Sequence, residues 1–326
     1  MVERIGDNRS KAYALAAELW VSTIVAPKTL DDFQILQKDA IAVALGTTDA
    51  YLQNHIRFHI GWEEVHRGRM NDAREWAREL MQVGAHLNDP RSTGFGLGLL
   101  TWIALASDSH AEALENSEQS LAVAVTPIDR LSAISAKGSA LILLGRIDEG
   151  VPLLKELRER CTADGCLYFL NTADVLNGLV EILQGNIGKG IRLIEDVISR
   201  LDKAGDRFGA DWTRRNLAEV YLQIIMGKEK PPLSVVLKNL PILLTVMVTA
   251  SSRIRALIAH SLENPRFDPA GFHIGQAKMM LGLLYKAKKK RALAVQHLTE
   301  AKRIFSQFGQ IPILGRVETA LAELGQ

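Results

Sequence analysis

Apolar residues recur along the chain at helical spacing, in blocks rich in alanine and leucine that short Gly, Asp or Pro breaks separate. Long alternating runs of β-branched residues, which would predict strands, do not occur, and no Asn-Gly turn joins two such runs. The pattern therefore predicts an all-α protein whose helices are joined by short turns.

The helical blocks repeat with a period of about 40 residues, which indicates a stacked array of similar units. Three blocks align well: residues 67–83, 144–160 and 184–200. Each begins with a turn glycine, has a small residue five positions later and is preceded by another glycine seven positions earlier. These positions are Gly61/Gly68/Ala73, Gly138/Gly145/Gly150 and Gly178/Gly185/Gly190. A glycine has no Cβ, so we expect the two helices of each hairpin to approach closely there.

A second signature marks the start of each new hairpin. Residues 5–20, 87–102 and 204–221 share a Gly/Asn-Asp turn that leads into a long helix, where a polar side chain can accept hydrogen bonds from the first N–H groups. We expect residues 1–227 to form about five hairpins, 228–272 an inserted helical segment and 273–326 a final repeat with a capping helix. The stretch "VERI" reads as the last turn of a helix whose beginning is missing.

The small-residue pattern resembles the tetratricopeptide repeat (TPR), in which a small residue of the first helix packs on small residues of the second. The matching sets are Gly61/Ala73, Gly138/Gly150, Gly178/Gly190 and Gly282/Ala294/Ala301. The period here is longer than the usual repeat of about 34 residues, so longer helices are expected. The resemblance implies a right-handed superhelix of αα-hairpins whose concave face binds a partner protein.

Residues 282–314 are also similar to the tail of bacterial multidomain regulators, in which a class III adenylate/guanylate cyclase or DNA-binding domain precedes an ATPase module and repeats. This resemblance implies a sensory or scaffold region that regulates an attached ATPase or cyclase in bacterial signal transduction. The chain itself is predicted not to be an enzyme. A cyclase needs paired metal-binding aspartates on strands, and this sequence predicts no strands.

Composition narrows the possible partners. The sequence is 47% hydrophobic and 23% charged with a net charge of +2, so no global field favours nucleic acid or an anionic membrane. The two cysteines, Cys161 and Cys166, are too few for a disulfide framework. The apolar run "LPILLTVMVTA" at 240–250 is too short to cross a membrane as a helix. We expect a soluble cytoplasmic protein with no cofactor.

His55, His59, Glu63 and His66 fall within an arc of about 80° on a helix, a spacing that metal ligands also show. The metalloprotease motif HExxH is absent. In the TPR register the three histidines occupy positions that line the groove. A groove wall or surface is therefore the preferred interpretation, with core histidines and a metal-binding or enzymatic face as alternatives, and no metal is expected.

Three tryptophans occupy equivalent repeat positions: Trp20, Trp62 and Trp102. One interpretation is an aromatic stripe for a peptide or partner helix. The other, which Phe58 and Val65 beside Trp62 favour, is packing between neighbouring helices. Trp212 is expected to face the groove of a later repeat. The predicted partner-binding residues are Trp20, His55, Phe58, His59, Trp62, His66, Trp102 and Trp212.

The sequence thus favours a non-catalytic region that binds a protein or peptide partner, or upstream domains of a parent chain. One alternative is a homo-oligomeric scaffold that self-associates through residues 240–250. The other is a helical metal-binding or enzyme domain that uses the face formed by His55, His59, Glu63 and His66.

Overall fold

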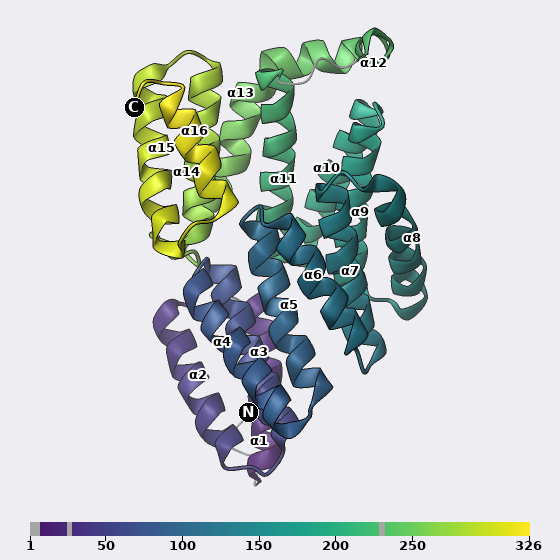
Figure 1. Cartoon of the computed structure of the whole chain (residues 1–326), viewed down its shortest axis with the longest axis vertical. Helices are drawn as coiled ribbons and strands as arrows, with labels where there is room; N and C mark the ends of the chain where they lie inside the picture. The colour runs from purple at the N-terminus through teal and green to yellow at the C-terminus, as the bar shows by residue number, and fades with distance from the viewer. Residues whose placement is uncertain (1–6, 25–27, 228–231) are drawn as a thin grey trace. The chain divides into compact units, whose positions relative to one another are not determined.

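The computed structural model describes residues 7–326, apart from 25–27 and 228–231, and every regular element in this part of the chain is helical (Figure 1). The all-α prediction is confirmed. The helices are α1 (Asn8–Ile24), α2 (Leu30–Leu45), α3 (Ala50–Arg67), α4 (Met70–Leu87), α5 (Pro90–Ala106), α6 (His110–Ala122), α7 (Pro127–Leu143), α8 (Ile147–Asp164), α9 (Leu167–Leu183), α10 (Ile187–Ala204), α11 (Arg207–Met226), α12 (Leu233–Lys238), α13 (Leu240–Leu262), α14 (Phe272–Ala287), α15 (Arg291–Phe305) and α16 (Pro312–Ala322), with a short 3-10 turn, η2 (Ser306–Phe308). The expected helix end at residues 2–5 lies outside the described residues.

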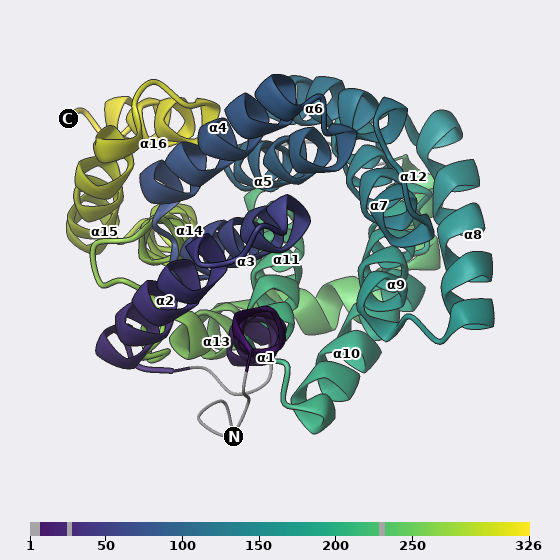
Figure 2. The ribbon, with the colours of Figure 1, turned by 90° about the horizontal axis from the view of Figure 1, so that it is seen from below.

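The chain divides into two compact units, Met1–Ala140 and Leu141–Gln326, which we call unit 1 and unit 2. In unit 1 the pairs α1–α2, α3–α4 and α5–α6 form helical hairpins, and α3 lies between α1 and α5 (Figure 2). In unit 2 packing runs from α8 through α9, α10 and α11 to α13 and α14, and then to α15 and α16. Helices therefore pack mainly on their neighbours in sequence, as expected for a repeat array.

The turns between helices are made by the residues that the repeat pattern singled out. Gly68, Gly145 and Gly185 adopt the left-handed conformation with φ of 81°, 75° and 83°. This conformation is easy only for glycine, and it ends the first helix of each hairpin. The side chains of Asp89 and Asp206 accept hydrogen bonds from the backbone N–H groups at the starts of α5 and α11, at 3.1 and 2.8 Å.

Close approach of paired helices also follows the glycine pattern. A Cβ added to Gly61 would lie 2.7 Å from Leu99 Cδ1 and 3.0 Å from Trp76 Cβ. A Cβ on Gly190 would collide with the carbonyl oxygen of Gly178 on α9. The prediction that these glycines permit tight helix contacts is confirmed, because no larger residue fits without moving a neighbour.

The apolar stretch at 240–250 forms the first half of α13, which is 23 residues long and so extends well beyond the eleven apolar residues. Val246, Ala250 and Ile254 on one side are buried, and the helix packs on α11 and α14. On the other side Leu244 and Val248 are 60% and 83% exposed. Within the described residues, α13 is the one helix whose length and composition would suffice to cross a membrane.

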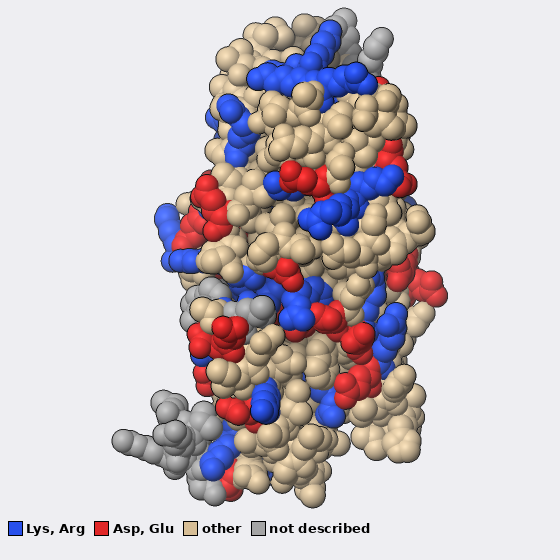
Figure 3. Space-filling view, turned by 90° about the vertical axis from the view of Figure 1, so that its left-hand side faces the viewer, with Lys and Arg blue, Asp and Glu red and all other residues tan. Residues whose placement is uncertain are grey.

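Charged side chains are distributed in both signs. On the face drawn in Figure 3, acidic and basic groups lie next to one another in the middle and lower part, and the charged groups at the upper end are mainly basic. In the protein as described, several charged side chains form ion pairs, such as Arg57 to Glu79 at 2.7 Å and Arg316 to Glu219 at 2.9 Å. Both pairs remain accessible to solvent on at least one side, and such pairs contribute little stability each, about 0–1 kcal/mol.

Candidate partner-binding site

Aromatic and imidazole rings from α1, α3 and α5 gather in unit 1. We call this set the aromatic row; its members are Trp20, Tyr51, His55, Phe58, His59, Trp62, His66, Phe95 and Trp102. Six of the nine lie on α3, where spacings of three and four residues place their side chains on one face of the helix. The neighbouring helices α1 and α5 supply the other three.

Ring contacts join the three helices. Phe58 stacks on Phe95 with ring centroids 4.7 Å apart, and Trp62 meets Trp102 edge to face at 5.6 Å. On the other side, Trp20 of α1 packs edge to face on His59 at 5.2 Å. Such geometries are favourable for aromatic pairs, contributing about 0.5–1.5 kcal/mol beyond area burial. These ring contacts therefore stabilise unit 1, and the contact with His59 also restricts the position of the Trp20 ring.

His55 and His59 form a directly bonded pair in the middle of the row. Their Nε2 atoms are 3.0 Å apart and their ring centroids 4.3 Å apart, so one nitrogen donates and the other accepts. Burial lowers the pKa of His55 to about 4, with the Arg91 charge acting in the same direction, and burial lowers the pKa of His59 well below its usual range. The rings of His55 and His59 are therefore both neutral near pH 7.

The Arg91 side chain adds a cation beside Tyr51 and Phe95 of the aromatic row. The Arg91 guanidinium lies 4.6 Å from the centroid of the Tyr51 ring and 5.4 Å from that of Phe95, and it pairs with Asp129 at 3.2 Å. Sequence reasoning missed Tyr51, Arg91 and Phe95. The four-residue spacings of Tyr51 to His55 and Arg91 to Phe95 were the available signal.

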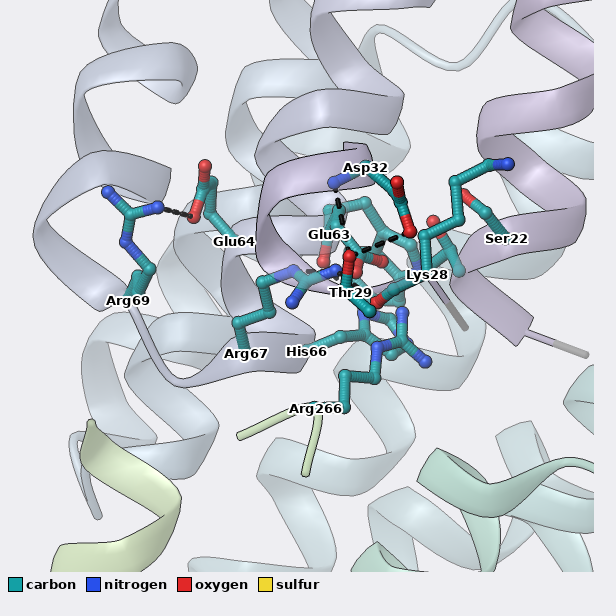
Figure 4. Close-up of polar contacts among 12 residues, drawn as sticks. Ser22, Lys28, Thr29, Asp32, Glu63, Glu64, His66, Arg67, Arg69 and Arg266 are labelled. Atoms are coloured by element: carbon teal, nitrogen blue, oxygen red, sulfur yellow. Dashed lines mark hydrogen bonds and ion pairs between the residues drawn. The ribbon is translucent and has the colours of Figure 1, made fainter. Parts of the chain in front are cut away.

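Glu63 and His66, the other two members of the predicted histidine face, make contacts within the fold (Figure 4). His66 Nδ1 donates to the carbonyl oxygen of Trp62 at 2.7 Å, and Glu63 Oε1 pairs with Arg67 Nε at 2.9 Å. Both acidic and basic partners of that ion pair are buried. Within the described parts of the chain, no three His, Cys, Asp or Glu side chains are grouped so that they could hold a metal ion.

The structure places the predicted site residues at different depths. Trp20 is 39% exposed, whereas Trp62 is only 5% exposed. His55, Phe58 and Trp102 are half-buried. The expectation that the histidines form an exposed groove wall is not met at His59 and His66, which are buried. Repeat register gives the direction of a side chain, but it does not show how far the rings of adjacent helices cover it.

Trp212 does not join the aromatic row. It lies in unit 2, on α11, where it is half-buried and packs against Val175, Val197 and Leu201. This tryptophan contributes to a helix interface. That it also faces the groove of its repeat stays a prediction.

No protein-family model matches this sequence, and no curated protein matches it. Among solved structures, the chain is similar to a Rap protein solved in complex with competence and sporulation factor. The two share 11% sequence identity and a TM-score of 0.59, over 99% of this chain and 90% of that chain. Similarity at this low identity concerns the fold, and it agrees with the repeated helical hairpins. The chain has an all-α, TPR-like helical-repeat fold.

Proposed function

We propose that this chain is a non-catalytic interaction protein that binds a protein or peptide partner. The proposed binding surface is the exposed face of α1 that carries Tyr13 and Trp20, which we call the α1 edge. The observation that carries the proposal is the exposure of two large aromatic side chains on α1, Tyr13 at 44% and Trp20 at 39%. They are seven residues apart, two helical turns, and so they lie on the same face. The structural neighbour, solved in complex with competence and sporulation factor, supports a binding role for the fold.

The physical argument rests on ordered, half-exposed rings. Tyrosine and tryptophan provide much of the binding energy at protein interfaces, because they offer a large apolar area with few rotatable bonds. Trp20 already rests on His59, so little side-chain freedom remains to be lost when a partner covers its outer surface. The neutral His55–His59 pair behind it avoids the cost of covering a charge.

The test is a pull-down from native lysate with the wild type and the Tyr13→Ala/Trp20→Ala variant. Leu87→Ala is the matched control, since Leu87 is also in unit 1, at the end of α4, and is 50% exposed. We expect specific partners to be lost only from the double variant, with unchanged helicity by circular dichroism. Retention of the same partners by the folded double variant would remove the α1 edge as the binding surface.

At a finer level, we propose that partner binding here regulates an attached ATPase or nucleotide cyclase of a bacterial signalling protein. The similarity of residues 282–314 to the tails of such regulators supports this role. In a longer chain that carries such a domain, Tyr13→Ala/Trp20→Ala should abolish the effect of the partner on nucleotide turnover. Basal turnover should remain, because the substitutions lie outside the attached catalytic domain.

A second candidate function is self-association through α13. Its exposed side carries Leu240, Leu244, Met247 and Val248, which are 43%, 60%, 53% and 83% exposed. Contiguous apolar surface of this kind often marks an interface. Light scattering across a hundredfold concentration range tests it: a mass that rises with concentration in the wild type but not in Leu244→Glu favours a scaffold, and a constant monomer mass excludes it.

A further inference from the structure

A cavity of about 760 Å³ opens in unit 1 between α2, α3 and α4. From the 100° rotation per residue, Glu64 lies roughly opposite the aromatic row on α3. The cavity is therefore separate from the surface assigned above to partner binding. Its volume lies within the range of small-molecule sites, roughly 300–1,000 Å³.

The lining combines an apolar wall with an excess of carboxylates. Trp76 of α4 and Ile41 and Leu45 of α2 supply apolar surface. The acidic groups are Glu64, Asp72, Glu75 and Glu79, against two cations, Lys38 and Arg69. The whole chain carries a net charge of +2, so this negative balance is local and not a general property of the protein.

Internal ion pairs neutralise only part of that charge. Arg69 is shared between Asp72, at 2.6 Å, and Glu64, at 3.3 Å. Glu79 pairs with Arg57 at 2.7 Å but remains 44% exposed. The exposed Glu75 makes no ion pair within the described part of the chain. A further cationic group can therefore enter the cavity and bind Glu75 and Glu79 without displacing Arg69.

Glu64 is the most buried carboxylate of the lining. Its side chain is 4% exposed, and its Oε2 forms an ion pair with Arg69 Nη1 at 3.3 Å but accepts no hydrogen bond. Burial raises the pKa of Glu64 to about 7, with Asp72 and Glu63 acting in the same direction and Arg69 and Arg67 opposing it. A buried carboxylate with few donors is destabilised, and an incoming ammonium group would add a charge-assisted hydrogen bond to the one ion pair with Arg69.

We propose that this cavity binds a linear polyamine, with ammonium groups at Glu64 and at the Glu75/Glu79 pair and the connecting methylenes against Trp76. Polyamines alternate charge with apolar stem, which matches carboxylates set around an indole ring and an aliphatic wall. A bare divalent cation fits less well, because the carboxylates are spread apart: no three acidic or histidine side chains in the described residues could share one metal ion.

Isothermal titration calorimetry with spermidine tests the proposal. We expect one site per chain, at least tenfold weaker binding to Glu75→Gln/Glu79→Gln, and no more than a twofold change for Asp39→Asn, a matched exposed carboxylate of α2 outside the lining. Mg²⁺ at equal ionic strength should give no saturable signal. Circular dichroism confirms that the variants remain folded.

The pH dependence provides a second readout. Spermidine stays cationic between pH 6 and 8, while Glu64 loses its proton across this range, so affinity should rise roughly tenfold. Glu64→Gln should abolish that rise. Equal spermidine binding by the wild type and Glu75→Gln/Glu79→Gln would overturn the proposal, as would the absence of binding or a site that accepts only a lysine-rich peptide.

Discussion

Replacing Gly190 by alanine adds one methyl group at the tightest point between α9 and α10. The new Cβ would collide with the carbonyl oxygen of Gly178 and lie 2.5 Å from Ile182 Cγ1. The obstacle is backbone, so the two helices must separate by about 1 Å to restore van der Waals distance. Overpacking of this kind costs about 3 kcal/mol at its upper range, and alanine regains about 1 kcal/mol of helix propensity.

The net expectation is a loss of about 2 kcal/mol, which for a unit of this size lowers Tm by roughly 4–8 °C. The control is Gly188→Ala in the same helix, where a Cβ would meet nothing nearer than Arg192 Nη1 at 3.6 Å. That change should leave Tm unchanged or raise it. Thermal and urea unfolding followed by circular dichroism measure both. If Gly190→Ala is as stable as Gly188→Ala, the close-approach argument is refuted.

Three further outcomes follow from the contacts described above. Asp49→Ala removes the side chain that accepts from Leu52 N–H at the start of α3, and should cost about 1 kcal/mol in urea unfolding. Trp62→Ala should cost about 3–5 kcal/mol in the same assay, whereas Trp20→Ala, with its ring partly in solvent, should cost less than half as much. The pKa of Glu64 is about 7 in the folded protein, against its usual 4.5, so the folded state binds this proton more tightly than the unfolded state does. The free energy of unfolding of the wild type should therefore fall as the pH rises from 4.5 to 7. Glu64→Gln should remove this fall, a difference on the order of 1 kcal/mol by pH 8.

The hairpin architecture could be predicted because glycine restricts the possibilities so strongly. Gly68, Gly145 and Gly185 occupy left-handed turns that other residues adopt only with strain, and Gly178 and Gly190 mark a contact that admits no Cβ. These constraints act over a few residues or across one hairpin. Local sequence therefore contains the information that determines them.

The depth of the candidate site could not be predicted in the same way. Helical spacing correctly grouped His55, His59 and Trp62 on one face of α3, but their burial depends on rings from α1 and α5. The acidic cavity depends even more on distant segments, since Glu64 and Trp76 meet residues of α2. Nothing in the local sequence links these positions before the helices are packed.

Sequence-local packing has a consequence for how the protein is made. Because α1 pairs with α2, α3 with α4 and α5 with α6, each hairpin finds most of its partners within a few tens of residues. Such topologies have low contact order and fold quickly. Unit 1 can therefore begin to assemble on the ribosome hairpin by hairpin, while the helices of unit 2 are still being synthesised.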